Sequence, residues 1–292
     1  MANRRVLVKR RKSVRNIRKI TRTMQLIATA RFQAAFNRAV AARPYTEKLA
    51  ELVADLGRAA GSVEHPLLQT REPVQRSALV VLTSQRGLCG GYNSNVLRAA
   101  LGHLDEQQAR GVPTDVHMVG RKGVAYFRFV RRPLLDQSTD ISDRPRFEEI
   151  EPLANTLMER FLRGVVDVVH VAYMRFYSAS RQRPEVIQLL PLAPTAAPAP
   201  LPGARREVLY DFYPDPATLL AELLPATVRV RLYQAFIDAS VSEQIARMVA
   251  MKAATEASEE MIRGLTLKYN RARQTAITME LLDIVGGANA LA

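Results

Sequence analysis

The 292-residue chain is 48% hydrophobic, enough for a sizeable core, and its formal net charge is +14. Its one cysteine, Cys89, excludes a disulfide within the chain and a cysteine-rich zinc site. No apolar run approaches the roughly 18–20 residues of a membrane-spanning helix. The basic N-terminus lacks the apolar stretch of a secretory signal, so none is expected.

The first predicted element is a basic helix over residues 3–57. Residues 1–46 contain thirteen Lys or Arg and no acid, which implies an acidic partner: nucleic acid, membrane head groups or an acidic protein surface. Pro44 is expected to kink this helix, and Gly57 and Gly61 to close it before His65-Pro66. A heptad-like seam recurs at steps of three and four: Val14, Ile17, Thr21, Met24 and Ala28.

In the middle of the chain, the apolar residues no longer recur at the spacing of one long helix. Short apolar runs at 78–83, 116–119, 165–176 and 185–190 predict strands, and residues 93–110, 121–130 and 146–163 predict helices. Strands that alternate with helices favour an α/β layer with a largely parallel sheet.

The proline-rich segment 191–202 is predicted to be an extended surface linker. A short helix over 217–224 is expected to end at Pro225. A second long helix then runs from Ala226 to about Val285, roughly 90 Å at 1.5 Å per residue. Its seam contains Val241, Ile245, Met248, Thr255, Ile262, Leu265, Tyr269 and Ala272.

Such a long helix needs a partner along its length, and the N-terminal helix has a similar seam. We therefore expect the two terminal helices to pair, with the α/β domain inserted between them. The expected division is a helix over 1–60, an α/β domain over 75–195, a linker with a short helix over 196–225, and a helix over 226–288.

Chemical motifs are sparse. Gly87–Gly91 follows a strand and precedes a helix, as phosphate-binding loops do, but it matches neither glycine-rich nucleotide motif. A tight turn with positive φ is the favoured interpretation. The four histidines are scattered, and no catalytic residue, cofactor or metal site is predicted. The absence of such motifs favours binding or a mechanical role over catalysis. A basic coiled coil that binds nucleic acid and a small α/β enzyme that uses the Gly87–Gly91 turn remain alternatives.

Five segments carry a family resemblance that spans the chain in order. They are Lys19–Met24, Leu82–Asn93, Gln188–Leu192, Ala246–Thr255 and Leu267–Ala288, the last including Tyr269-Asn270-Arg271-Ala272-Arg273-Gln274 and Glu280-Leu281-Leu282-Asp283-Ile284-Val285-Gly286-Gly287. Together they resemble the gamma subunit of F-type ATP synthases. Gln85 departs from the family pattern, which has Asp at this position.

The resemblance implies a rotor shaft. The terminal helices would form an antiparallel coiled coil inside a ring of three α and three β subunits, and the inserted domain would be Rossmann-like and three-layered. The shaft would couple ion-driven rotation of the c-ring to ATP synthesis or hydrolysis on β, as a non-catalytic subunit without a cofactor. Partners would include the epsilon subunit but no nucleic acid, at the cytoplasmic face of a bacterial inner membrane or at an organellar inner membrane, without insertion.

The resemblance also implies contact residues. Met24, Arg247, Gln274, Thr278 and Glu280 match positions that contact β; Met24 would equally suit the helix seam. An apolar tip turning within the ring would consist of Ile277, Leu281, Leu282, Ile284 and Val285. Tyr210 and Asp211 lie near the family's foot, which contacts the c-ring and the epsilon subunit.

Overall fold

The computed structural model describes residues 4–59, 65–192 and 215–291. Helical and extended segments alternate between two long terminal helices, α1 and α5. In chain order the elements are α1 (Arg4–Ala59), the 3-10 turn η1 (Pro66–Leu68), β1 (Ser77–Leu82), α2 (Tyr92–Ala109), β2 (Thr114–Val119), α3 (Arg121–Phe129), β3 (Asp136–Ser138), α4 (Phe147–Leu162), β4 (Val168–Ser178), β5 (Arg181–Leu190) and α5 (Pro216–Leu291).

The strands form one mixed sheet in the order β3-β2-β1-β4-β5. Strand β1 is central and pairs in parallel with β2 and β4, while β5 returns antiparallel to β4. All six residues of β1 are buried, as expected for an inner strand covered on both faces. The predicted largely parallel sheet is confirmed, as are the long terminal helices.

Helices cover the two faces of this sheet. Leu79 and Val81 of β1 point to the face packed by α2 and α3. Val80 and Leu82 point to the opposite face, where α4 and the first part of α5 lie. The period-2 alternation along one strand therefore supplies both apolar layers.

Three details differ from the expected elements. The short edge strand β3 was not predicted, because Asp136-Gln137-Ser138 contains no β-favouring apolar residue and depends on pairing with β2. Strands β4 and β5 form a hairpin, so both extend to a turn at Ala179. The α1 helix continues through Pro44 as expected, but it ends at Ala59, two residues beyond the expected end at Gly57.

The predicted break at Pro225 is wrong, because α5 runs through this residue from Pro216 to Leu291. A proline inside a helix removes one hydrogen bond and costs about 3 kcal/mol. Leu220, Leu224 and Val228 are almost fully buried in the sheet's core on either side of it. Burying three such side chains stabilises by about 1.5–3 kcal/mol each, which outweighs the loss.

The chain divides into two compact units. One consists of residues 31–246 and contains the sheet, and the other combines residues 1–30 with 247–292. The expected linker over 196–225 falls mostly outside the described residues, and its helical part belongs to α5.

Candidate functional site

The unit made of residues 1–30 and 247–292 is a pair of antiparallel helices. The Thr255 hydroxyl donates to the Thr21 hydroxyl at 2.8 Å, and Arg18 pairs with Glu259 at 3.5 Å. Further along, the Arg11 guanidinium lies 4.8 Å from the centre of the Tyr269 ring. Residue numbers fall on α1 as they rise on α5, so the two strands of the pair run in opposite directions.

The seam between these helices combines small, polar and larger apolar side chains. On α1 the buried positions are Leu7, Thr21 and Ala28, and on α5 they are Arg247, Met251, Thr255 and Ser258. Ile17, expected in the seam, is half exposed, because the neighbouring position Arg18 faces α5 instead. Small residues at these positions allow close approach of the two backbones.

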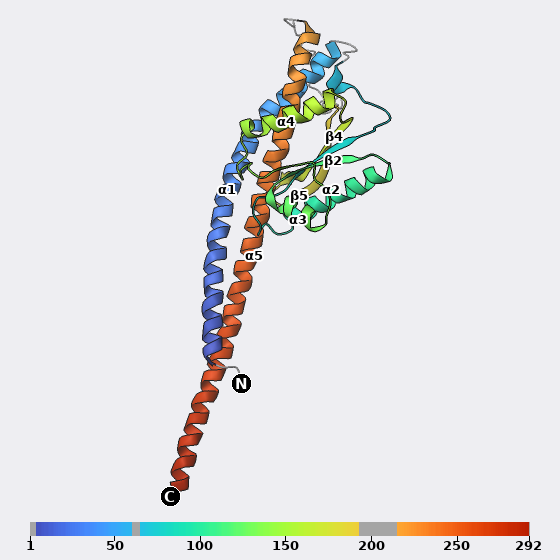
Figure 1. Ribbon diagram of the computed structural model, residues 1–292. Coiled ribbons are helices and arrows are strands. Elements are labelled where there is room, and N and C mark those ends of the chain that lie inside the picture. The colour runs from blue at the N-terminus through green and yellow to red at the C-terminus, as the bar shows by residue number, and fades with distance from the viewer. Residues whose placement is uncertain (1–3, 60–64, 193–214, 292) are drawn as a thin grey trace. The chain divides into compact units, whose positions relative to one another are not determined.

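Beyond this pair, the end of α5 runs on alone within its unit. Tyr269 already lies opposite Arg11, so the residues after Ala276 extend past the first turn of α1, as the red end of α5 shows in Figure 1. These last turns span roughly 22 Å at 1.5 Å per residue.

This free end of α5 is strongly apolar. Six large side chains are between 47% and 68% exposed: Ile277, Met279, Leu281, Leu282, Ile284 and Val285. Ile277, Leu281 and Ile284 share one helix face, whereas Met279 and Leu282 lie on another. A helix that is apolar on several faces is stable only when it is surrounded. We call residues 277–285 the apolar tip.

The other residues expected to contact a partner are placed differently. Gln274, Thr278 and Glu280 are exposed, and the Thr278 hydroxyl bonds only to the Gln274 carbonyl of its own helix at 3.0 Å. Met24 is half-buried beside the seam, while Arg247 is only 7% exposed. Tyr210 and Asp211 lie outside the described residues.

Most basic side chains near the start of α1 face solvent. Arg11 and Arg18 interact with α5, as described above. The exposed members of the same helix include Arg4, Lys9, Arg10, Lys12, Arg15, Lys19 and Arg22. The helical pair therefore carries a continuous positive surface that attracts an acidic partner.

Hydrogen bonds within the segment and to the start of α2 hold the glycine-rich turn after β1. The Ser84 backbone N–H donates to the Asn93 side-chain oxygen at 2.9 Å, and the Ser84 hydroxyl donates to the Arg86 carbonyl at 2.7 Å. Gly90 has a φ of +54°, which is positive as predicted, and the φ of Leu88 is also positive, at +64°. The backbone conformation expected for this turn is confirmed at Gly90.

The same turn lies at the carboxyl end of β1, where open α/β sheets bind ligands. Phe236 and Ser240 of α5 pack into this place, and the cavity that remains is about 40 Å³. Ligand pockets usually measure roughly 300–1,000 Å³. The space is thus too small for a nucleotide.

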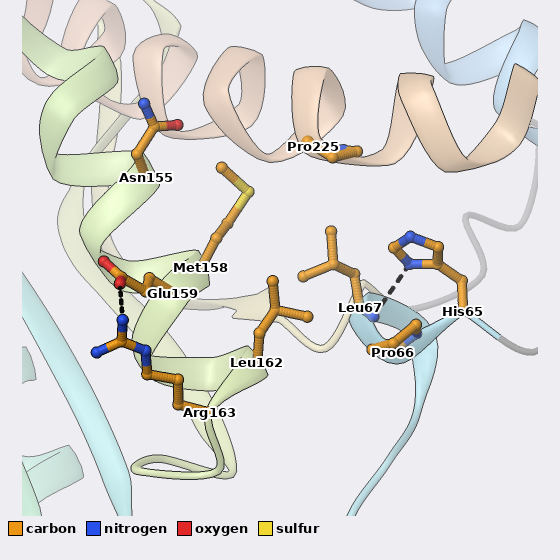
Figure 2. A pocket seen from close by; sticks show the side chains of 9 residues that line it. All are labelled: His65, Pro66, Leu67, Asn155, Met158, Glu159, Leu162, Arg163 and Pro225. Carbon is orange, nitrogen blue, oxygen red and sulfur yellow. Dashed lines mark hydrogen bonds and ion pairs between the residues drawn. The ribbon is translucent and has the colours of Figure 1, made fainter.

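A larger cavity of about 480 Å³ opens among η1, α4 and Pro225. Figure 2 shows its apolar floor of Leu67, Met158 and Leu162, with His65 at one end and the Glu159–Arg163 ion pair at the other. The His65 ring accepts a hydrogen bond from the Leu67 backbone at 3.2 Å, so one of its nitrogens is already used. No arrangement of acid, base and nucleophile faces this cavity among its lining residues.

Two of the histidines pack against each other. The centres of the His103 and His170 rings lie 4.4 Å apart with the ring planes tilted by 58°, on the side of the sheet covered by α2. Burial, and then the neighbouring His103, lower the pKa of His170 to about 4. Over residues 4–59, 65–192 and 215–291, no three His, Cys, Asp or Glu side chains converge as metal ligands.

The structure defines a class of proteins with an antiparallel helical pair that ends in an uncovered apolar helix. Comparison with known proteins identifies the family within that class. The sequence model of the family described as ATP synthase matches residues 3–291. No helix in the described part of the chain is long and apolar enough to cross a membrane.

Two curated relatives are close along their whole length. The chain is 41% identical to the ATP synthase gamma chain of Rhodopirellula baltica, covering 100% of this chain and 99% of that one. It is 43% identical to the gamma chain of Dehalococcoides mccartyi, covering 100% of both. The rotor of Euglena gracilis mitochondrial ATP synthase has a similar fold, with a TM-score of 0.62 and 15% identity over 94% of this chain and 98% of that one. The chain belongs to the family of ATP synthase gamma chains.

Proposed function

We propose that this chain is the rotating central shaft of an ATP synthase. Its paired helices turn inside a ring of three α and three β subunits and couple rotation of the c-ring to ATP synthesis or hydrolysis on β. The chain supplies no catalytic group. Within this proposal, residues 1–60 and 226–288 form an antiparallel coiled coil, residues 75–195 form a Rossmann-like three-layer domain, and residues 196–225 connect the two.

The apolar tip is the observation that carries this proposal. Six large apolar side chains on one helical end remain exposed in the isolated chain. Burying a side chain of this kind stabilises by about 1.5–3 kcal/mol, so the tip provides a strong drive to enter an apolar sleeve. A ring of subunits around the helix axis covers all its faces at once, whereas a flat partner covers one.

The asymmetry of the helical pair accounts for the mechanical role. One face presents the basic residues of α1 and another presents α5, with Glu256, Glu259 and Glu260. Three identical sites around such a shaft meet three different surfaces at any moment. Each site's conformational equilibrium is therefore biased differently, and rotation passes each bias to the next site.

Specific contacts are part of the proposal. Gln274, Thr278 and Glu280 are exposed polar groups next to the apolar tip, suited to hydrogen bonds with β. Met24, half-buried at the seam, exposes only part of its side chain to the ring. Arg247 is buried in the isolated chain and has to rotate outward to reach β.

The c-ring and the epsilon subunit are further partners in this proposal, with Tyr210 and Asp211 as the contact residues. The chain would then be a peripheral protein at the cytoplasmic face of a bacterial inner membrane. The bacterial origin of its two close relatives supports that location.

Co-expression with the α and β subunits of a bacterial ATP synthase tests the proposal. We expect one copy of this chain per ring of three α and three β subunits. Removing residues 275–292 should lower torque and coupling, with the β catalytic groups intact. ATP hydrolysis by the isolated chain, or failure to join the ring, would contradict the proposed function.

A further inference from the structure

The outer face of α3 combines exposed aromatic and basic side chains that the shaft function does not use. Phe129 is 83% exposed, and Tyr126, Val130 and Leu135 are also exposed. Lys122, Tyr126 and Phe129 are spaced at i, i+4 and i+7, and so form one row along the helix. Arg121 and Arg128 form the adjacent row. We call residues 121–135 the α3 face.

This face carries positive charge without compensation. Residues 121–135 contain five Lys or Arg and no acid. Arg132 pairs with Asp105 of α2 at 2.8 Å, and the next acid along the chain, Asp136, lies 3.2 Å from the His117 ring. Among the described residues, no ion pair to a carboxylate is found for Arg121, Lys122, Arg128 or Arg131.

The charge and composition of the α3 face favour a lipid surface as its partner. Neither cavity described above is lined by α3. A cluster of roughly four to eight Lys or Arg on an amphipathic helix is typical of binding to anionic lipid head groups, and residues 121–135 contain five. Aromatic residues beside these basic side chains suit the boundary between lipid head groups and acyl chains.

We propose that the α3 face binds an anionic phospholipid surface. Phe129 and Leu135 enter the boundary between head groups and acyl chains, while Arg121, Lys122, Arg128 and Arg131 contact lipid phosphates. The inference is independent of the apolar tip, and it gives the sheet-containing unit a contact of its own with a membrane.

The absence of tryptophan from the sequence allows a direct test. In full-length protein carrying Phe129→Trp, the emission of the single tryptophan reports on the α3 face alone. With vesicles of phosphatidylglycerol and phosphatidylcholine at physiological ionic strength, we expect a blue shift and quenching by brominated acyl chains. Partition should be at least about tenfold weaker for pure phosphatidylcholine vesicles.

The basic α1 helix could also draw the protein to anionic vesicles, so two matched controls are needed. Ile20→Trp, an exposed reporter on α1, should bind without quenching by the brominated chains. Adding Arg121→Glu and Arg128→Glu to the Phe129→Trp protein should abolish its blue shift. The same charge reversal at Arg15 and Lys19 should leave the shift in place.

Two outcomes would overturn the proposal. One is vesicle binding with an unchanged emission of Phe129→Trp, since another part of the chain would then hold the membrane. The other is a blue shift with soluble polyglutamate but not with vesicles, which would make the α3 face a protein-docking surface.

Discussion

The hydroxyl groups of Thr21 and Thr255 meet at 2.8 Å inside the helical pair, where both residues are less than 10% exposed. The Thr21 hydroxyl also bonds to the Arg18 carbonyl at 3.1 Å, and the Thr255 hydroxyl lies 2.8 Å from the Met251 carbonyl. This polar layer in the seam favours one register of α1 against α5, because a slip would break the hydrogen bond between the two hydroxyls, although each hydroxyl would keep a carbonyl of its own helix.

Replacing one threonine of this pair should lower the free energy of unfolding by more than half of the loss caused by replacing both. Thr255→Val leaves the Thr21 hydroxyl short of one partner, and we expect a loss of about 1–2 kcal/mol. Thr21→Val combined with Thr255→Val should recover part of it. A double-mutant cycle from urea unfolding measures the coupling, and strictly additive changes would mean that the bond contributes nothing.

The apolar tip should matter for coupling but not for folding of the free chain. Leu281→Ser with Ile284→Ser should change the free energy of unfolding by less than about 0.5 kcal/mol, because both side chains are exposed. In the proposed ring the same change should remove about 3 kcal/mol of apolar contact and reduce ion-coupled ATP synthesis. Val165→Ser, exposed on the other unit, serves as the control, and equal activity of both variants would refute the role of the tip.

Gly120 should tolerate no side chain. Its φ is +96°, and a Cβ there would stand 2.2 Å from the Thr83 carbonyl oxygen. Gly120→Ala should therefore destabilise by about 3 kcal/mol or more, because strain and overlap add. Gly264→Ala is the matched control in an open helical position, and it should stabilise by about 0.5–1 kcal/mol. Thermal unfolding of the two variants should shift in opposite directions.

Asp143 connects segments that are far apart in sequence. Its carboxylate pairs with Arg31 of α1 at 2.9 Å, and its carbonyl accepts from Ser240 of α5 at 3.0 Å. The carboxylate is nearly buried, so Asp143→Ala should cost about 2–3 kcal/mol by leaving Arg31 without its partner. Glu256→Gln, which breaks the exposed contact with Lys252, should cost less than about 0.5 kcal/mol in the same chemical unfolding assay.

Acid should weaken the protein through His170. Burial lowers its pKa in the folded state to about 4, so between that pH and about 6.5 the unfolded chain binds more protons. The stabilisation from the neutral imidazole is complete above about pH 6.5 and is lost as pH falls towards 4. At about 1.4 kcal/mol per pKa unit, the difference between 6.5 and 4 corresponds to roughly 3 kcal/mol. His170→Leu should flatten the pH dependence of urea unfolding in this window. His65→Gln should have a smaller effect in the same direction, because burial also lowers the pKa of His65.

The sequence predicted the fold where periodicity is strong. The buried run in β1 and the seam around Thr255 both appear as expected, because burial imposes period 2 or heptad spacing on the residues themselves. The break expected at Pro225 failed, since local propensity cannot reveal how much core Leu220 and Leu224 bury on either side. Strand β3 was missed for a similar reason, because its pairing with β2 is non-local.

At the candidate site, too, some features are visible in the sequence and others depend on tertiary packing. Apolar residues at the end of α5 were visible in the sequence, and their exposure is what the structure adds. Arg247 gave no sign of being buried, because an arginine is usually exposed unless tertiary packing encloses it. The α3 face was also overlooked. Its signal was five basic residues interleaved with aromatics over 121–135, without a single acid.

Cys89 is buried beside Ser84 and Asn93 in the turn after β1, and it is the only cysteine in the sequence. Thiol reagents act on accessible thiolates, so the native chain should react slowly. A cysteine introduced at exposed Ala288, just beyond the apolar tip, would then be the one fast-reacting thiol. The emission of a single small dye attached there would report whether the end of α5 is enclosed in the assembled complex, without prior removal of native thiols.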